Sequence, residues 1–128
     1  MTSARALPAP SAERAARYRA LGWWDARLLA DGIEAAAARR PGAPALIDDE
    51  VSLSRAELAA TVGAAVAALS AHGVRAGDSV VLVSGNTRHG VIAYHGLLRL
   101  GALITALDRR CGPADLRAAL DTLPGRAR

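Results

Sequence analysis

The sequence contains no lysine and no phenylalanine, and it has a single cysteine among its 128 residues. All sixteen basic residues are arginines, so the chain has no amine for a Schiff base and no lysine ammonium for a phosphate contact. The lone thiol, Cys111, excludes an internal disulfide and gives no sign of secretion. Because aromatic residues make up only 3% of the chain, alanine, valine and leucine must build the core.

The body of the chain also lacks an excess of charge of one sign and long apolar runs. The net charge of +4 comes from residues 1–20, which carry +3, and from residues 121–128, which carry +1. Residues 21–120 are therefore neutral, and they lack the basic stripe that a nucleic-acid partner requires. No apolar run reaches the length of a signal-peptide core or a membrane span. We expect a soluble cytoplasmic protein with neither a nucleic-acid nor a membrane partner.

The residues that are present predict one folded domain that opens with a helix and a hairpin. With 52% apolar and 22% charged residues, the chain is globular in composition. Apolar residues at helical spacing predict a helix over residues 26–40, with Asp25 as its N-cap. Two short strands, at residues 45–47 and 51–53, flank the acidic turn Asp48-Asp49-Glu50 and predict a hairpin.

The clearest helix in the sequence follows this hairpin. Ser54 and Glu57 form a capping box at its start, and Gly73 offers a left-handed cap at its end. The chain then alternates between a strand at residues 80–83, a helix at residues 87–100, a strand at residues 102–107 and a helix that begins at Pro113. This alternation is typical of a parallel α/β sheet, and the unbroken apolar run at residues 80–83 predicts a strand that is covered on both faces.

Two loops follow the expected parallel strands, SGNT at residues 84–87 and DRRC at residues 108–111. The carboxyl ends of parallel strands share one edge of a sheet, so both loops are expected to face a common crevice. In a functional interpretation, Asn86 and nearby backbone N–H groups bind an anion, with Arg109 as a second contact. In the alternative, Asn86 or Thr87 caps the next helix and the arginines lie in water. We favour the cap, because no glycine-rich phosphate-binding motif occurs in the sequence.

The histidines and the cysteine do not form a recognisable catalytic or metal-binding pattern. His72 lies at a helix end, where it can interact with the last carbonyl groups. His89 and His95 are six residues apart and therefore lie on different sides of a helix, so we expect no metal site there. Cys111 has no base in the sequence that would activate it as a nucleophile.

Several boxes in their order resemble the N-terminal portion of the AMP-dependent (adenylate-forming) acyl-CoA synthetase and ligase family. They are LSRAEL at residues 53–58, GVRAGDSV at residues 73–80, Asn86, and LRLGALITALD at residues 98–108. YRALGWW at residues 18–24 is similar to the openings of the aryl and fatty acyl branches. The resemblance implies a partial N-terminal subdomain of the synthetase fold, with parallel βαβ units preceded by a short hairpin. Arg55 and the pair Ser84-Gly85 depart from the family's usual boxes.

The resemblance also implies a reaction that this chain cannot complete. The family uses ATP, magnesium and coenzyme A to convert a carboxylic acid into an acyl-adenylate and then an acyl-CoA. Its phosphate loop, acidic ATP and magnesium residues and catalytic lysine come later than the boxes found here. We therefore assign no catalytic, cofactor-binding or metal-binding residue to this chain, and we expect it to be an N-terminal fragment that is inactive alone. A non-catalytic interaction module and a small nucleotide-binding α/β domain remain as alternatives.

The expected organisation has three parts. Residues 1–20 form a flexible N-terminal arm, residues 21–120 the truncated synthetase subdomain, and residues 121–128 a C-terminal tail. Trp23 and Trp24 are expected to anchor the arm by packing onto the domain. An early portion of a larger sheet would expose apolar surface, so we expect either a complementary ligase fragment as partner or self-association through that sheet surface.

Overall fold

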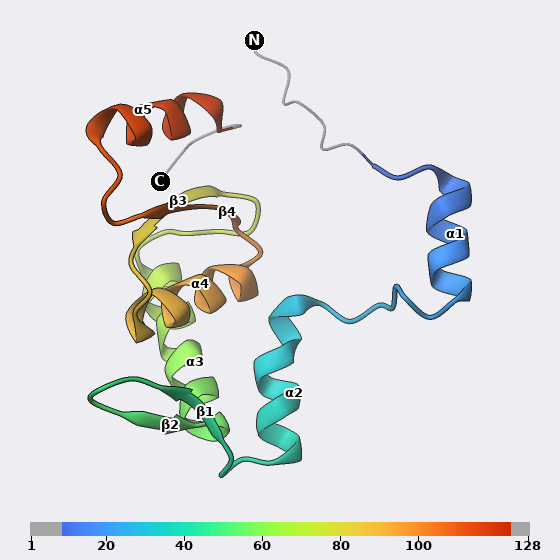
Figure 1. Ribbon diagram of the computed structural model, residues 1–128, viewed down its shortest axis with the longest axis horizontal. Coiled ribbons are helices and arrows are strands. Elements are labelled where there is room, and N and C mark those ends of the chain that lie inside the picture. The colour runs from blue at the N-terminus through green and yellow to red at the C-terminus, as the bar shows by residue number, and fades with distance from the viewer. Residues whose placement is uncertain (1–8, 124–128) are drawn as a thin grey trace.

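A computed structural model of the chain describes residues 9–123 (Figure 1). In chain order its elements are α1 (Ala12–Ala20), the 3-10 helix η1 (Leu29–Asp31), α2 (Gly32–Arg39), β1 (Pro44–Ile47), β2 (Ser52–Ser54), α3 (Arg55–Ala71), β3 (Ser79–Ser84), α4 (Arg88–Leu100), β4 (Leu103–Asp108) and α5 (Pro113–Thr122). The strands form two separate sheets, β1 with β2 and β3 with β4. Within the described residues, no helix is both long and apolar enough to cross a membrane.

The predicted parallel unit is confirmed. Strands β3 and β4 pair in parallel, with a register that runs from Ser79 opposite Leu103 to Ser84 opposite Asp108. Helix α4 connects the two strands, so the three elements form a βαβ unit. The core lies between this helix and the sheet. It consists of buried Val74, Leu97 and Ala102, against which Leu69, Val80, Leu82, Leu100 and Ile104 pack.

The other face of the parallel sheet is exposed. Side chains alternate between faces along a strand, so the residues next to Val80 and Leu82 point away from α4. On that outer face, Val83 is 45% exposed and Leu103 is 46% exposed. The prediction that residues 80–83 are covered on both faces is therefore wrong for this structure. The physical reason is that α4 covers one face, and the described residues include no second layer packed on the other.

The hairpin and helix α3 are confirmed in detail. Strands β1 and β2 are antiparallel, with Leu46 opposite Leu53. At the start of α3, the Glu57 N–H donates to Ser54 Oγ at 3.3 Å, and the Ser54 N–H donates to Glu57 Oε2 at 2.8 Å. At its end, Gly73 has a φ of 90°, and the following N–H, of Val74, donates to the carbonyl of Leu69 at 3.1 Å. This geometry is a Schellman motif, in which a left-handed glycine lets the chain leave the helix.

The helix predicted over residues 26–40 begins later than expected. The 3-10 turn η1 precedes α2, which starts at Gly32. Asp25 does not cap it, because its carboxylate accepts a hydrogen bond at 2.9 Å from the Arg27 N–H and pairs with the Arg27 guanidinium. Asp31 binds the Leu28 N–H at 3.2 Å instead. Each acidic side chain thus closes a local turn, and the helix can begin only after the second of them.

The N-terminal segment of residues 9–29, called the arm from here on, contains helix α1, which the sequence did not predict and which stands away from the body of the molecule (Figure 1). Residues 1–8 of the expected flexible arm lie outside the described residues, as do residues 124–128 of the expected tail. The expected anchoring by Trp23 and Trp24 is wrong. Trp23 is 66% exposed, and both indoles pack on Tyr18, at centroid distances of 5.4 and 5.2 Å. The three aromatic residues are close together in the sequence, so their rings pack on one another and not on the body.

Candidate functional site

A depression of about 240 Å³ lies at the carboxyl ends of β3 and β4. Parallel strands end at the same edge of a sheet, and this edge is where open α/β folds bind ligands. The lining comes from the end of β3 and the loop after it, from one face of α4, and from the end of β4. These residues are Leu82, Ser84, Gly85, Asn86, Thr87, Gly90, Val91, Tyr94, His95, Ala106 and Leu107. The candidate site is therefore mainly apolar, with polar groups gathered on one loop.

The two loops expected to share a crevice do meet, through Arg109. A Cβ atom placed on Gly85 would lie 3.0 Å from Arg109 Cδ and 3.3 Å from its Nε, so the arginine side chain packs over that glycine. Arg110 instead pairs with Asp108, at 3.0 Å between Nε and Oδ1. Hydrogen bonds from the Arg110 backbone N–H, and then from its side chain, lower the pKa of Asp108. Only the first loop lines the depression itself.

The choice between Asn86 and Thr87 as the helix cap is settled in favour of Thr87. Its hydroxyl oxygen accepts a hydrogen bond at 3.2 Å from the Gly90 N–H, in the first turn of α4. Asn86 is exposed and lines the depression. A cap of this kind already satisfies one of the N–H groups that an anion would need at a helix N-terminus. The cap alternative is thus confirmed, and the N-terminus of α4 gives no separate support for a bound anion.

Gly90 lets the first turn of α4 approach the end of β3, a contact that no local sequence pattern indicates. A Cβ at Gly90 would lie 2.3 Å from Ser84 Oγ and 3.0 Å from the carbonyl oxygen of Gly85. The Ser84 hydroxyl donates to that same carbonyl at 2.9 Å. Any side chain at position 90 would therefore push the helix away from the loop and change the shape of the depression.

Tyr94 and His95 form the aromatic part of the lining. Their rings lie 5.7 Å apart at an interplanar angle of 89°. His95 Nδ1 is buried and makes no hydrogen bond to any described residue. Both residues share a helix face with Val91, three and four positions earlier, so helical spacing could have placed them at the site. Within residues 9–123, no group of three or more histidines, cysteines or acidic residues is placed to hold a metal ion.

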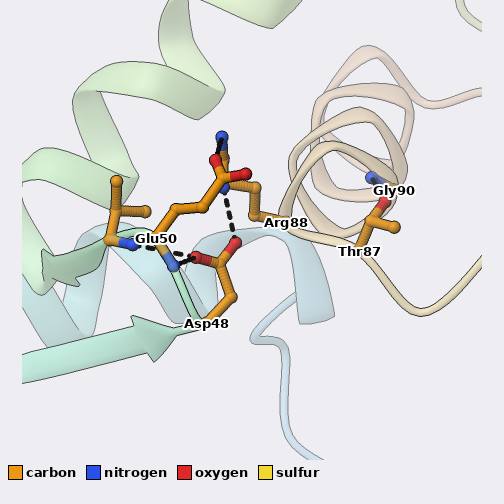
Figure 2. Close-up of polar contacts among 6 residues, drawn as sticks. Asp48, Glu50, Thr87, Arg88 and Gly90 are labelled. Atoms are coloured by element: carbon orange, nitrogen blue, oxygen red, sulfur yellow. Dashed lines mark hydrogen bonds and ion pairs between the residues drawn. The ribbon is translucent and has the colours of Figure 1, made fainter.

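Arg88 ties the start of α4 to the hairpin turn, as Figure 2 shows. Its guanidinium lies 2.8 Å from Asp48 Oδ2 and 2.6 Å from Glu50 Oε2. The Asp48 carboxylate also accepts hydrogen bonds at 2.9 Å from the N–H groups of Glu50 and Val51. The contact with Arg88 first, and then these two N–H groups, lower the pKa of Asp48 to about 2. These ion pairs join the first residue of α4 to the hairpin turn.

Sequence reasoning missed this cluster, although one signal was present. A cation in the first turn of a helix opposes the helix dipole, so Arg88 needs an anionic partner. The acidic turn supplies it from a position about forty residues earlier in the chain, where the sequence pattern indicates only a hairpin connection. A similar pairing joins Arg99, in the last turn of α4, to Glu34 of α2. Helix α4 is therefore held at both ends.

The remaining candidates lie apart from the depression. His72 Nδ1 is 2.8 Å from the carbonyl oxygen of Ala68, which confirms its expected role at the end of α3. His89 is exposed on the first turn of α4, beside the hairpin turn. Cys111 is half-buried in the loop after β4 and does not line the depression. The structure thus brings Asn86, Thr87 and His95 together and leaves His72, His89 and Cys111 elsewhere.

The fold and its parallel-strand edge define an N-terminal subdomain of the adenylate-forming class of enzymes. The chain belongs to the family described as AMP-binding enzyme, whose model matches residues 33–123. The match includes both strands of the parallel sheet, α4 and all residues that line the depression.

Curated relatives and solved structures agree with this assignment. The 2-hydroxy-7-methoxy-5-methyl-1-naphthoate–CoA ligase of Streptomyces carzinostaticus is 36% identical, over 80% of this chain and 20% of its own length. The salicyl-AMP ligase / salicyl-S-ArCP synthetase of Mycobacterium tuberculosis is 39% identical, over 76% and 18%. The apo structure of Mycobacterium smegmatis MbtA superposes with a TM-score of 0.84 and 35% identity, covering 90% of this chain and 22% of that one. The chain spans about a fifth of the length of these relatives.

Proposed function

We propose that this chain supplies the N-terminal part of an adenylate-forming ligase that activates an aromatic carboxylic acid. The observation that carries the proposal is its identity of 36 and 39% with two ligases named for aromatic acids, over at least three quarters of the chain. Those names favour the aryl branch over the fatty acyl branch, both of which the YRALGWW segment had suggested. The lining of the depression is mainly apolar, which supports this proposal because such a surface is suited to packing against later parts of the fold.

In the proposed reaction, a carboxylate oxygen of the acid attacks the α-phosphorus of ATP. The bond to pyrophosphate breaks, and an acyl-adenylate forms; a thiol then displaces AMP to give a thioester, with coenzyme A as the proposed acceptor. The described residues do not fit a magnesium–ATP complex, because no metal-binding group is present among them and no arginine lines the depression. No reaction step is therefore assigned to a residue of this chain. Its proposed contribution is structural, through the βαβ unit that α4 holds together.

The experiment that tests this proposal is ATP–pyrophosphate exchange with the purified chain and a panel of aromatic acids. We expect no exchange above background, because the chain has no lysine and no group that fits magnesium. Exchange by the chain alone would contradict the proposed inactivity. The coding sequence that adjoins the gene provides the second readout. A serine-, threonine- and glycine-rich phosphate loop found there supports the proposal, and its absence from both the same and neighbouring reading frames counts against it.

A second candidate function is nucleotide binding by the chain alone, and the position of Arg109 over Gly85 favours it. That contact places a guanidinium beside the strand edge where nucleotides bind in related architectures. Titration calorimetry with ATP and AMP tests this candidate, using Arg109→Ala and the matched control Arg110→Ala. Binding that Arg109→Ala abolishes and Arg110→Ala preserves would favour this function. No heat at millimolar nucleotide would remove it.

A further inference from the structure

The depression at the carboxyl ends of β3 and β4 contains a histidine whose ring nitrogens have no partner among the described residues. His95 lines the depression, and its Nδ1 is buried without a hydrogen bond. Its other ring nitrogen, Nε2, retains accessible surface and has no hydrogen-bond partner among residues 9–123 either. A polar group that the protein leaves unpaired at the wall of a cavity is available to a ligand.

The burial of Nδ1 indicates which nitrogen carries the proton in the neutral ring. A buried N–H group without an acceptor has lost its hydrogen bond to water, and folded proteins leave donors unpaired less often than acceptors. We therefore place the proton on Nε2. Because Nδ1 has no accessible surface, the polar group that His95 can present to the depression is the Nε2–H donor.

The rest of the depression suits a flat apolar ring. Its volume is about 240 Å³, and a cavity of roughly 150 Å³ already holds a benzene molecule. Leu82, Val91 and Leu107 supply aliphatic surface, and the ring of Tyr94 stands at 89° to the ring of His95. Two aromatic side chains in this arrangement offer a ligand ring both a face and an edge.

We propose that Leu82, Val91, Tyr94, His95 and Leu107 form a seat for the ring of a hydroxylated aromatic acid, with the ring hydroxyl oxygen accepting a hydrogen bond from His95 Nε2–H. This inference rests on the proposed function, which supplies the aromatic acid, and it adds a binding role to the structural contribution proposed there. We call these five residues the ring seat.

The orientation of the acid in the ring seat follows from charge. No arginine lines the depression, so it offers a carboxylate no permanent positive charge. A neutral hydroxyl needs no such partner, because a hydrogen bond with a neutral donor satisfies it. The hydroxyl would therefore point inward to His95, and the carboxylate would lie at the open side, over which the later parts of the fold would pack.

NMR titration of the 128-residue chain tests the ring seat. The probes are hydroxybenzoates and methylbenzoates substituted at the same ring position, because a hydroxyl and a methyl group are similar in size and only the hydroxyl accepts a hydrogen bond. We expect at least one hydroxybenzoate to bind roughly tenfold more tightly than its methyl counterpart and to shift the signals of Tyr94 and His95. Equal affinities within every pair, or no saturable binding at millimolar concentration, would overturn the proposal.

Two histidine substitutions test the role of His95. His95→Phe keeps an aromatic ring and removes both nitrogens, so it is expected to abolish the preference for the hydroxyl and to preserve the binding of the methylbenzoate. His89→Phe is the matched control, because His89 lies on the same helix but is exposed and does not line the depression. The control variant should keep the tenfold preference. A preference that survives His95→Phe, or that both variants lose equally, would contradict the proposal.

The proton position of His95 keeps the proposal testable if His95→Phe does not fold. Long-range proton–nitrogen correlation spectra of the wild-type chain should place the proton on Nε2, and the Nε2 signal should move with the hydroxybenzoate and not with its methyl counterpart. A proton on Nδ1 would overturn the proposal. A stronger response of Tyr94 and His95 to AMP than to any hydroxybenzoate would assign the depression to a nucleotide and would also overturn it.

Separate readouts distinguish the ring seat from the proposed function. Hydroxyl-dependent binding that His95→Phe abolishes, with no phosphate loop encoded beside the gene, would leave the ring seat standing and remove the proposed function. A phosphate loop in the adjoining coding sequence, with no binding of the probes, would do the reverse.

Discussion

The βαβ unit and the N-terminal arm differ in how far they bury their apolar side chains. In the unit, α4 covers one face of the sheet, and Leu97 retains only 2% of its exposed surface. In the arm, Ala15 is the sole buried residue among residues 9–29, and the large side chains face solvent. The unit is stabilised by contacts between α4 and the sheet, whereas the arm is ordered by local contacts and leaves its apolar side chains exposed. Substitutions in the two regions should therefore differ sharply in effect.

The largest expected effect is that of Leu97→Ala. This side chain packs in the core with Val74 and Ala102, and its removal leaves a cavity that should cost about 2–5 kcal/mol. Trp23→Ala removes a larger side chain, yet we expect a change within about 0.5 kcal/mol in the isolated chain, because Trp23 is 66% exposed. Urea unfolding followed by circular dichroism measures both. Comparable losses in the two variants would show that the arm packs on the body.

The next effect concerns the close contact between α4 and the end of β3. Gly90→Ala is expected to destabilise the chain by about 1–3 kcal/mol, because the new Cβ would lie 2.3 Å from Ser84 Oγ. Gly63→Ala is the matched control, since a Cβ there meets only the end of the Arg99 side chain, at 4.0 Å. That control should gain up to about 1 kcal/mol from the better helix propensity of alanine. Thermal melts that rank the two variants in the opposite order would refute this account of the contact.

Features that depend on a few neighbouring residues could be predicted from the sequence. The capping box of Ser54 and Glu57, the glycine turn at Gly73 and the cap at Thr87 each join atoms within five residues of one another. Their hydrogen bonds join groups that are close in sequence, so the residue types alone indicate them. The parallel pairing followed from the alternation of strands and helices, which restricts the possible topologies.

Features that depend on distant residues could not be predicted in this way. Arg88 pairs with Asp48 and Glu50 across about forty residues, and the residues near either acid do not indicate which cation it binds. The strand at residues 80–83 was expected to be covered on both faces, and Trp23 and Trp24 were expected to pack on the domain, because these side chains are apolar. Hydrophobicity indicates that a surface will be covered, but it does not say by which part of the chain or by which polypeptide.

A smaller effect distinguishes the helix cap from a ligand contact at the candidate site. Thr87→Ala removes the acceptor for the Gly90 N–H and should cost about 1 kcal/mol. Asn86→Ala should change stability by less than about 0.5 kcal/mol, because Asn86 is exposed at the edge of the depression. Chemical denaturation of both variants provides the comparison. A larger loss from Asn86→Ala would mean that the cap has been assigned to the wrong residue.

The smallest expected effect is the pH dependence that Arg88 confers on the body and not on the arm. Because Arg88 and two N–H groups depress the pKa of Asp48 from 3.8 to about 2, the folded state binds its proton less readily than the unfolded state does. The stability from this group is therefore fully present above pH 4 and is lost as the pH falls through about 2. Arg88→Met should reduce the loss of stability between these two pH values, measured as the shift in the urea midpoint. Arg27→Met serves as the control, because Arg27 makes an exposed pair with Asp25 in the arm, where local unfolding leaves the core intact. Identical pH profiles for the Arg88 variant and the wild-type chain would show that the hairpin turn does not stabilise α4 through this contact.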